Sequence, residues 1–216
     1  LLLQDLVGGG DLSTTIMNYD EMERPAKITA LLDLVRDIRR GDRKVLIWSN
    51  FVGSIDVIAR SVTNAGLGCA RIYGATPIIG LPDKDIKSRE QIIEDFLSFK
   101  SNTDVLVANP GACAESISLH KSCYHAIYYD LSYNCAQYLQ SLDRIHRVGG
   151  SEVRDAHYYF LQYQGTIDQD IHANLLRKRD KMYRIIDDNS DIYGLDVSPF
   201  VDGDGDAEAY DRIFRS

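Results

Sequence analysis

KVLIWS, residues 44–49, is a run of consecutive apolar side chains between Lys44 and Ser49. A strand with one face in water alternates apolar and polar residues, whereas a strand that is buried on both faces does not. The run therefore predicts a strand inside a sheet that other elements cover on both faces. DVLVA at 104–108 and HAIYYD at 125–130 have the same character and predict two more buried strands.

Between these runs, apolar residues recur every three or four positions, which is the period of an amphipathic helix. KITALLDLVRDI at 27–38 has this spacing, as do SIDVIARSVTNAG at 54–66 and SREQIIEDFLSF at 88–99. A strand is predicted near 69–73, another within RDAHYYFLQ at 154–162, and a long helix from about 166 to 186. Strands that alternate with helices predict an α/β fold: a doubly wound, mainly parallel sheet with helices on both faces.

The bulk properties of the chain narrow the possible classes of function. With 216 residues, 44% of them hydrophobic and 26% charged, the composition is that of a globular protein. No apolar run approaches the roughly 20 residues that span a bilayer, so we expect no membrane partner. The net charge of −8 argues against non-specific binding of nucleic acid, although a local basic cleft can lie within an acidic protein.

Cysteine and histidine usage points away from disulfides and metals. The four cysteines form no CxxC pair, which favours free thiols and an intracellular, cytoplasmic location. His120, Cys123 and His125 lie close together, but their spacing suits no common zinc site. We therefore predict no metal site in this chain.

Functional residues of a doubly wound sheet lie beyond the carboxyl ends of its strands. QYLQSLDRIHRVGG at 137–150 begins at this edge, because it follows the predicted strand at 125–130. Asn134, with Gln137 three residues later, predicts a capping box that opens a helix. On one helix, Gln140, Arg144 and Arg147 would lie within roughly 60° of one another. Two guanidinium groups near this edge suit recognition of a phosphate chain.

The other half of a phosphate site is absent from the sequence. No GxxxxGK[ST] loop occurs, so the chain has no Walker loop to cradle phosphates, and no GxGxxG fingerprint occurs either. A nucleotide site built here would supply arginines while another domain supplied the cradle. We therefore expect half of a nucleotide site.

Five segments in the same order resemble the C-terminal RecA-like lobe of superfamily-two helicases, specifically the Swi/Snf (sucrose-non-fermenting) group of DNA-dependent ATPases. KVLIWSNF at 44–51 resembles that group's motif IV, and RIYGAT followed by REQIIEDF resembles its next segment. DVLVANPGACAESISL at 104–119 resembles motif V, QYLQSLDRIHRVGG resembles motif VI, and GTIDQDI at 165–171 resembles a short signature beyond it. The resemblance covers about three quarters of the chain and implies a RecA-like α/β fold.

The resemblance also implies roles for particular residues. The motif VI arginines of the family face ATP that the Walker loop of the other lobe binds. Carried over, Arg147 is the arginine finger on the γ-phosphate, with Arg144 and Gln140 in support. Glu115 and Ser116, in motif V, would line the nucleotide cleft. ATP and Mg²⁺ would be bound mainly by the missing N-terminal lobe, so the isolated chain is expected to be inactive as an ATPase.

The same resemblance implies a track for double-stranded DNA along the carboxyl edge. The residues expected to contact it, mainly at phosphates, come from three loops: Ser49, Asn50, Gly74, Thr76, Asn109 and Ser118. The implied partners are therefore double-stranded DNA and the N-terminal RecA-like lobe of the same protein.

The expected domain organisation has three parts. Residues 1–26 would be a lead-in from a preceding lobe, 27–187 the helicase C-terminal lobe, and 188–216 an acidic tail. The chain would then be the C-terminal motor lobe of an ATP-dependent translocase or remodeller of double-stranded DNA. Two alternatives stay open: a lobe of a helicase that unwinds RNA or DNA, and a catalytically silent scaffold lobe.

Overall fold

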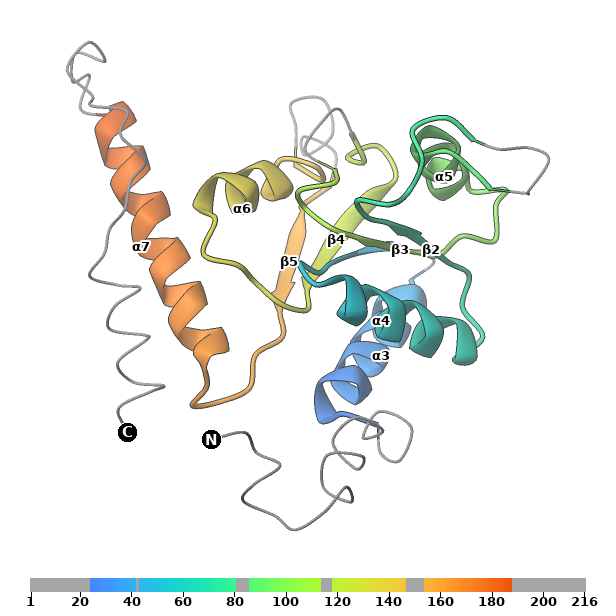
Figure 1. Ribbon diagram of the computed structural model, residues 1–216, viewed down its shortest axis with the longest axis horizontal. Helices are drawn as coiled ribbons and strands as arrows, with labels where there is room; N and C mark the ends of the chain where they lie inside the picture. The colour runs from blue at the N-terminus through green and yellow to red at the C-terminus, as the bar shows by residue number, and fades with distance from the viewer. Residues whose placement is uncertain (1–23, 42, 81–85, 114–117, 147–153, 188–216) are drawn as a thin grey trace, which may run out of the picture.

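The computed structural model describes residues 24–41, 43–80, 86–113, 118–146 and 154–187. The predicted lead-in at 1–26 and the predicted tail at 188–216 therefore lie almost wholly outside the described residues. Within the described part, strands and helices alternate along the chain, as the sequence predicts (Figure 1).

A five-stranded sheet with the order β2-β3-β1-β4-β5 forms the centre of the molecule, and each neighbouring pair is parallel. The strands are β1 (Lys44–Trp48), β2 (Cys69–Ile72), β3 (Val105–Ala108), β4 (Cys123–Tyr128) and β5 (His157–Phe160). Since β1 lies between β3 and β4, the three runs that predict buried strands form the three central strands. The prediction of a doubly wound, parallel α/β sheet is confirmed.

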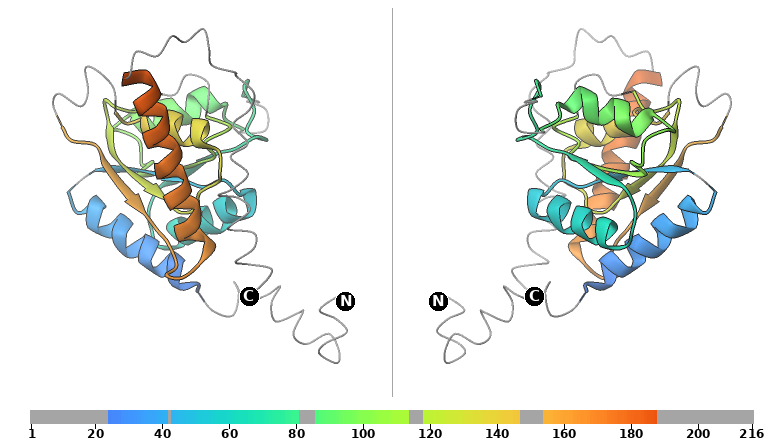
Figure 2. Two further views of the ribbon diagram at one scale, coloured as in Figure 1. Left: turned by 90° about the vertical axis from the view of Figure 1, so that its left-hand side faces the viewer. Right: turned by 90° about the vertical axis from the view of Figure 1, so that its right-hand side faces the viewer.

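Helices cover both faces of the sheet (Figure 2). On one face, α3 (Ala26–Arg39) and α4 (Val52–Asn64) pack against Val45 and Ile47 of β1. On the other, α5 (Arg89–Leu97), α6 (Cys135–Leu142) and α7 (Ile167–Asp187) pack against Leu46 and Trp48. Successive side chains of a strand point to opposite faces, so β1 needs apolar residues at every position.

The starts of two helices are set by side-chain caps. Asn134 Oδ1 accepts from Gln137 N at 3.1 Å, which confirms one half of the capping box predicted for α6. The other half is not formed, because Asn134 N donates to Ser132 Oγ at 3.4 Å. A complete capping box opens α5, where Ser88 Oγ accepts from Gln91 N at 3.2 Å and Ser88 N donates to Gln91 Oε1 at 2.9 Å. Each cap satisfies a backbone N–H that the helix itself leaves unpaired.

The end of α6 differs from the sequence prediction. The helix ends at Leu142, so Arg144 lies in the following turn rather than on a helix that continues to Arg147. The Leu142 carbonyl, which the N–H of residue 146 would use in a continuing helix, accepts from Tyr158 Oη at 2.7 Å instead. The Arg144 carbonyl accepts from Leu119 N at 2.9 Å, so the turn after α6 pairs with β5 and with the loop before β4.

Neither a membrane span nor a metal cluster is found in the described part of the chain. None of its helices is long and apolar enough to cross a lipid bilayer. Its His, Cys, Asp and Glu side chains do not gather in groups of three that could hold a metal ion.

One histidine is buried between neighbouring strands without a carboxylate. His125 of β4 is 3% exposed, and its ring stacks on His157 of β5 with a centroid distance of 4.8 Å. Burial, with smaller contributions from the charges of His157 and Arg43, lowers the pKa of His125 from 6.5 to about 4. The native protein therefore keeps this imidazole neutral at pH values where the unfolded chain protonates it.

We predict that this histidine makes the fold sensitive to acid. Between pH 6.5 and about 4 the unfolded chain binds the extra proton, so the free energy of unfolding falls as the pH falls. The contribution is at most about 3 kcal/mol. His125→Gln should flatten this decline in urea unfolding measured across the window, whereas His146→Gln, at an exposed imidazole, should not. Equal slopes for the wild type and His125→Gln would contradict the prediction.

Candidate functional site

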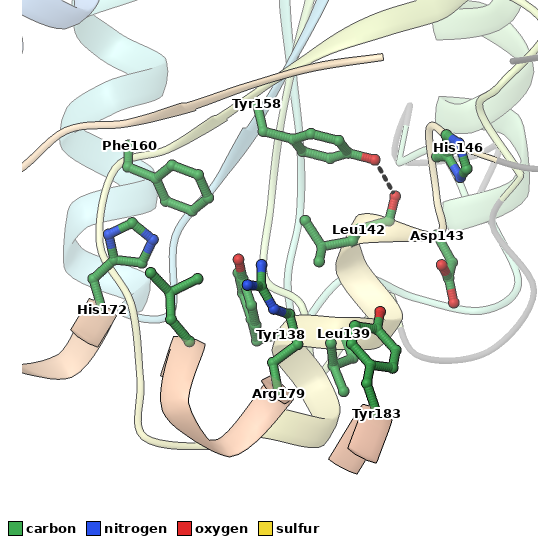
Figure 3. A pocket seen from close by; sticks show the side chains of 11 residues that line it. Tyr138, Leu139, Leu142, Asp143, His146, Tyr158, Phe160, His172, Arg179 and Tyr183 are labelled. Atoms are coloured by element: carbon green, nitrogen blue, oxygen red, sulfur yellow. Dashed lines mark hydrogen bonds between the residues drawn. The ribbon is translucent and has the colours of Figure 1, made fainter. Parts of the chain in front are cut away.

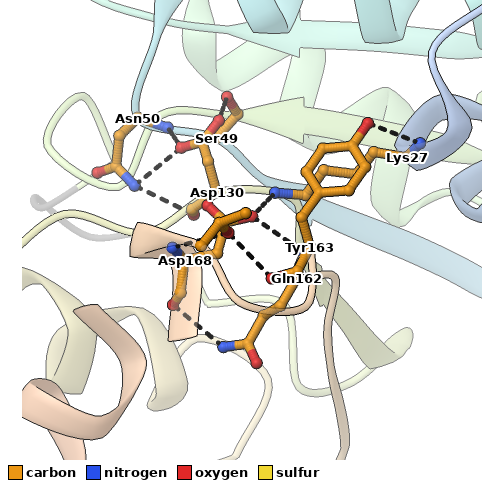
Figure 4. Close-up of polar contacts among 8 residues, drawn as sticks. Lys27, Ser49, Asn50, Asp130, Gln162, Tyr163 and Asp168 are labelled. Atoms are coloured by element: carbon orange, nitrogen blue, oxygen red, sulfur yellow. Dashed lines mark hydrogen bonds and ion pairs between the residues drawn. The ribbon is translucent and has the colours of Figure 1, made fainter. Parts of the chain in front are cut away.

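Asp130, the second residue beyond β4, links the carboxyl ends of β1 and β4. Its carboxylate accepts from Ser49 Oγ at 2.5 Å, from Asn50 N at 2.6 Å and from Asn50 Nδ2 at 3.2 Å (Figure 4). Parallel strands bring their carboxyl ends to the same edge, which is why residues 81 and 80 positions apart meet here. Asp130 was not among the residues predicted from the sequence. The signal that could have identified it is its position as a carboxylate just beyond a buried strand.

Asn109, which directly follows β3, stabilises the same edge from the other side of β1. Its Nδ2 donates to the Asn50 carbonyl at 2.9 Å, and its Oδ1 accepts from Gly111 N at 2.9 Å and Ala112 N at 3.2 Å. A Cβ on Gly111 would lie 3.1 Å from both Asn109 Oδ1 and Gln137 Nε2, so a larger residue there would have to displace these two side chains slightly. Asn50 is therefore fixed between Asp130 and Asn109.

Arg89, the first residue of α5, joins two loops of this edge. Its guanidinium donates to the carbonyls of Thr76 at 2.9 Å, Gly74 at 3.1 Å and Ala112 at 2.9 Å. This single side chain fixes the loop after β2 against the loop after β3. Sequence reasoning named the segment that carries Arg89 but not its role as a clamp between loops.

The predicted DNA-contacting residues divide into buried and accessible ones. Ser49 is 0% exposed and Thr76 is 8% exposed. Their hydroxyls bind within the protein, Ser49 Oγ to Asp130 and Thr76 Oγ1 to Tyr73 N at 3.0 Å. These two buried side chains therefore stabilise the conformation of the loops.

Gly74 is exposed, whereas Asn50 and Asn109 are half-buried. Ser118 is also half-buried, with its Oγ 2.7 Å from His120 Nδ1. Contact of any of the six with DNA stays a prediction.

The predicted arginine group is only partly within the described residues. Arg144 is 9% exposed and Gln140 is exposed on α6, whereas Arg147, Glu115 and Ser116 lie outside the described residues. Burial raises the pKa of the Cys113 thiol to about 12, and the charges of Arg89 and Arg144 oppose that rise. Both arginines therefore lie near enough to the loop after β3 for their charges to act on it.

A further anchor fixes the starts of α3 and α7 at this edge. Lys27 Nζ lies 2.7 Å from Asp168 Oδ2, with the lysine side chain 8% exposed, and its charge lies over the rings of Tyr129 and Tyr163 (Figure 4). Asp168 also accepts from Tyr163 N at 3.1 Å. The GTIDQDI segment thus contributes Asp168 as a structural contact to α3.

We predict that Asp130 stabilises the whole edge. Asp130→Ala leaves the Ser49 hydroxyl and the Asn50 N–H without their acceptor, which should lower the free energy of unfolding by roughly 2–3 kcal/mol. Asp155→Ala, at an exposed carboxylate before β5, is the matched control and should change it by less than about 0.5 kcal/mol. Chemical denaturation of both variants measures the difference, and equal values would refute a role for Asp130.

Comparisons with known proteins identify the family of this chain. Residues 26–149 match the family model described as the helicase conserved C-terminal domain. Relatives include the mouse DNA repair and recombination protein RAD54B, 26% identical over 76% of this chain. The ATP-dependent helicase fft1 of Schizosaccharomyces pombe is 30% identical over 68%, and the helicase swr1 of Aspergillus fumigatus is 26% identical over 88%. The chain spans only 18%, 14% and 11% of these relatives, respectively.

Solved structures share the fold. The crystal structure of the C-terminal part of the Fun30 ATPase domain superposes with a TM-score of 0.60 and 25% identity, covering 70% of this chain and 45% of that one. The Hef helicase domain of Pyrococcus furiosus, at 19% identity and a TM-score of 0.54, shares the fold over 74% of this chain and 31% of its own. The chain belongs to the helicase conserved C-terminal domain family, as a RecA-like lobe of the Swi/Snf type of superfamily-two helicase-like ATPases.

Proposed function

We propose that this chain is the C-terminal motor lobe of an ATP-dependent enzyme that moves along double-stranded DNA. The observation that carries the proposal is the attachment of the arginine-bearing turn to the segment between β3 and β4, through the 2.9 Å bond from Leu119 N to the Arg144 carbonyl. Arg144 and Arg89 then bring positive charge to the loop after β3. That arrangement suits an edge that meets phosphates.

Arg147 is the proposed finger on the γ-phosphate, because it follows the Arg144 turn within the motif VI resemblance. Its guanidinium would stabilise the charge that develops on the transferring phosphoryl group. Such fingers contribute about 10³ to 10⁵ in rate, or about 4 to 7 kcal/mol of barrier. Arg144, being buried, is proposed to hold the turn and the cleft loop in place, and Gln140 to contribute from the exposed face of α6.

This chain's residues fit one side of an ATP site. Arginines are present at the edge, but the sequence contains no phosphate-cradling GxxxxGK[ST] loop. When bound, ATP with Mg²⁺ supplies the phosphoryl group that is transferred to water. Glu115 and Ser116 are proposed to line this cleft, and the Walker loop and the Mg²⁺ ligands are proposed to come from the N-terminal lobe.

The proposed DNA track is a set of loops whose shape is fixed from within. Asp130, Asn109 and Arg89 hold the loops after β1, β2 and β3 through their hydrogen bonds. Backbone groups on rigid loops, with Gly74, Asn50, Asn109 and Ser118 beside them, suit contact with DNA phosphates, which positions a protein without reading bases. Ser49 and Thr76 would act on DNA only indirectly, by shaping these loops. The net charge of −8 disfavours binding of DNA over the whole surface of the chain, so contact with DNA would be confined to this local track.

The proposed partner lobe would face the same edge. The chain enters α3 beside the carboxyl edge, where the 2.7 Å ion pair of Lys27 with Asp168 anchors it. A preceding lobe connected at this point would begin beside the carboxyl edge. Lobe closure on DNA would then couple hydrolysis to movement.

We predict that Arg147→Ala in the full-length protein lowers DNA-stimulated ATP hydrolysis by about 10³-fold or more, because the developing charge loses its partner. Arg154→Ala removes an exposed arginine before β5, at the opposite edge, and should leave the rate within about twofold. Steady-state ATPase assays with duplex DNA, single-stranded DNA and RNA measure both the rate and the preferred nucleic acid. An unchanged rate for Arg147→Ala would favour a silent scaffold lobe, and stimulation by RNA alone would refute the DNA track.

We also predict that the 216-residue chain alone hydrolyses no ATP above background, with or without duplex DNA, because the phosphate cradle is in the other lobe. A colorimetric assay for released phosphate, with the full-length protein as positive control, tests this. DNA-stimulated turnover that stays with the purified chain through gel filtration would contradict it.

A further inference from the structure

A groove lies between α6, β5 and α7, separate from the carboxyl-edge network (Figure 3). Its volume is about 650 Å³. Aromatic and aliphatic side chains line most of it, among them Tyr138, Leu142, Phe160, Leu176 and Tyr183. Tyr183 is 50% exposed, although large aromatic side chains usually bury most of their surface. The groove is therefore an apolar surface that the described residues leave uncovered.

One wall of the groove is a face of α7 that also carries positive charge. His172, Leu176, Arg179 and Tyr183 recur along one side of this helix and line the groove. The helix holds five basic residues and one acidic residue between positions 177 and 184. Arg179 has an ion pair at 2.8 Å with its neighbour Asp180, which is 55% exposed, and such exposed pairs contribute little. An occupant should therefore combine apolar side chains with carboxylates.

The segment that directly follows α7 has this composition. DNSDIYGLDVSPF at 188–200 alternates apolar and small or acidic residues, with Tyr193, Leu195 and Val197 at every second position. In an extended chain these three side chains point to one side. Residues 188–216 carry eight acidic and two basic side chains, the opposite balance to that of α7 between positions 177 and 184, where Arg179 is the basic residue that lines the groove.

The segment is also long enough to cover the α7 wall of the groove. The α7 wall from His172 to Tyr183 is about 16 Å long at 1.5 Å per helical residue. Residues 193–200 span about 26 Å when extended at roughly 3.3 Å per residue, which leaves residues 188–192 to reverse direction after Asp187. We propose that residues 188–200 turn back along α7 and occupy this groove, with Tyr193, Leu195 and Val197 inward and Asp191 and Asp196 toward the basic side chains of α7.

Covalent attachment favours this occupant over a separate molecule. A segment joined by a short linker has an effective concentration in the millimolar range at the neighbouring site. DNA is disfavoured, because apolar side chains line most of the groove and Asp143 lies at its margin. The docked segment would lie beside the turn of Arg144, since Asp143 and His146 both line the groove.

Hydrogen exchange read by mass spectrometry on the full 216-residue chain tests the proposal. Amides of 193–200 should exchange at least roughly tenfold more slowly than an unstructured peptide of that sequence. Leu195→Asp should abolish this protection, whereas Ile213→Asp should leave it unchanged. From the groove side, Tyr183→Ala should weaken it, whereas Met182→Ala should not: Met182 is 40% exposed but does not line the groove. Circular dichroism and urea unfolding establish that each variant is folded.

Three results would overturn the proposal. The first is exchange of residues 193–200 at the unprotected rate in the wild type. The second is protection that rises with protein concentration together with a dimer in sedimentation, which would mean that the segment binds a second copy. The third is protection of the groove-lining peptides by added duplex DNA while 193–200 stays unprotected, which would mean that the groove binds nucleic acid instead.

Discussion

Parallel pairing of β1 with β3 and β4 brings the carboxyl ends of three buried strands to one edge, and the site depends on that register. Trp48 pairs with Ala108 on one side and Tyr128 on the other, so Ser49, Asn109 and Tyr129 follow at the same level. Loops that are distant in sequence must meet there and satisfy their polar groups. Both the rigidity of the edge and its capacity to present backbone groups follow from this pairing.

The polar side chains of the edge form hydrogen bonds mainly within the edge itself. Asp130 accepts from the loop after β1, Asn109 donates to the same loop, and Arg89 binds the loops after β2 and β3. Such a network makes the buried side chains structural, and in the proposed function it leaves exposed backbone and glycine for contact with phosphates. A motor lobe benefits from this arrangement, because a preorganised surface loses little entropy when a charged partner binds.

Sequence alone was sufficient for the fold, because runs such as 44–48 and the periodicity of 27–38 depend only on burial. It failed where tertiary hydrogen bonds decide the outcome. The helical pattern at 137–147 continues past Leu142, but the Leu142 carbonyl accepts from Tyr158 Oη and the helix ends there. Likewise, no spacing rule relates Asp130 to Ser49, because only strand register brings them together.

The central claim is that this chain supplies the arginine side of an ATP site shared between two lobes. A structure of the full-length protein with duplex DNA, ADP and a phosphate mimic such as aluminium fluoride tests it most directly. The account predicts that the Arg147 guanidinium lies within hydrogen-bond distance of the mimic, with the Arg144 turn beside it. A mimic held entirely by the other lobe, with the 143–147 turn facing away from it, would contradict the account.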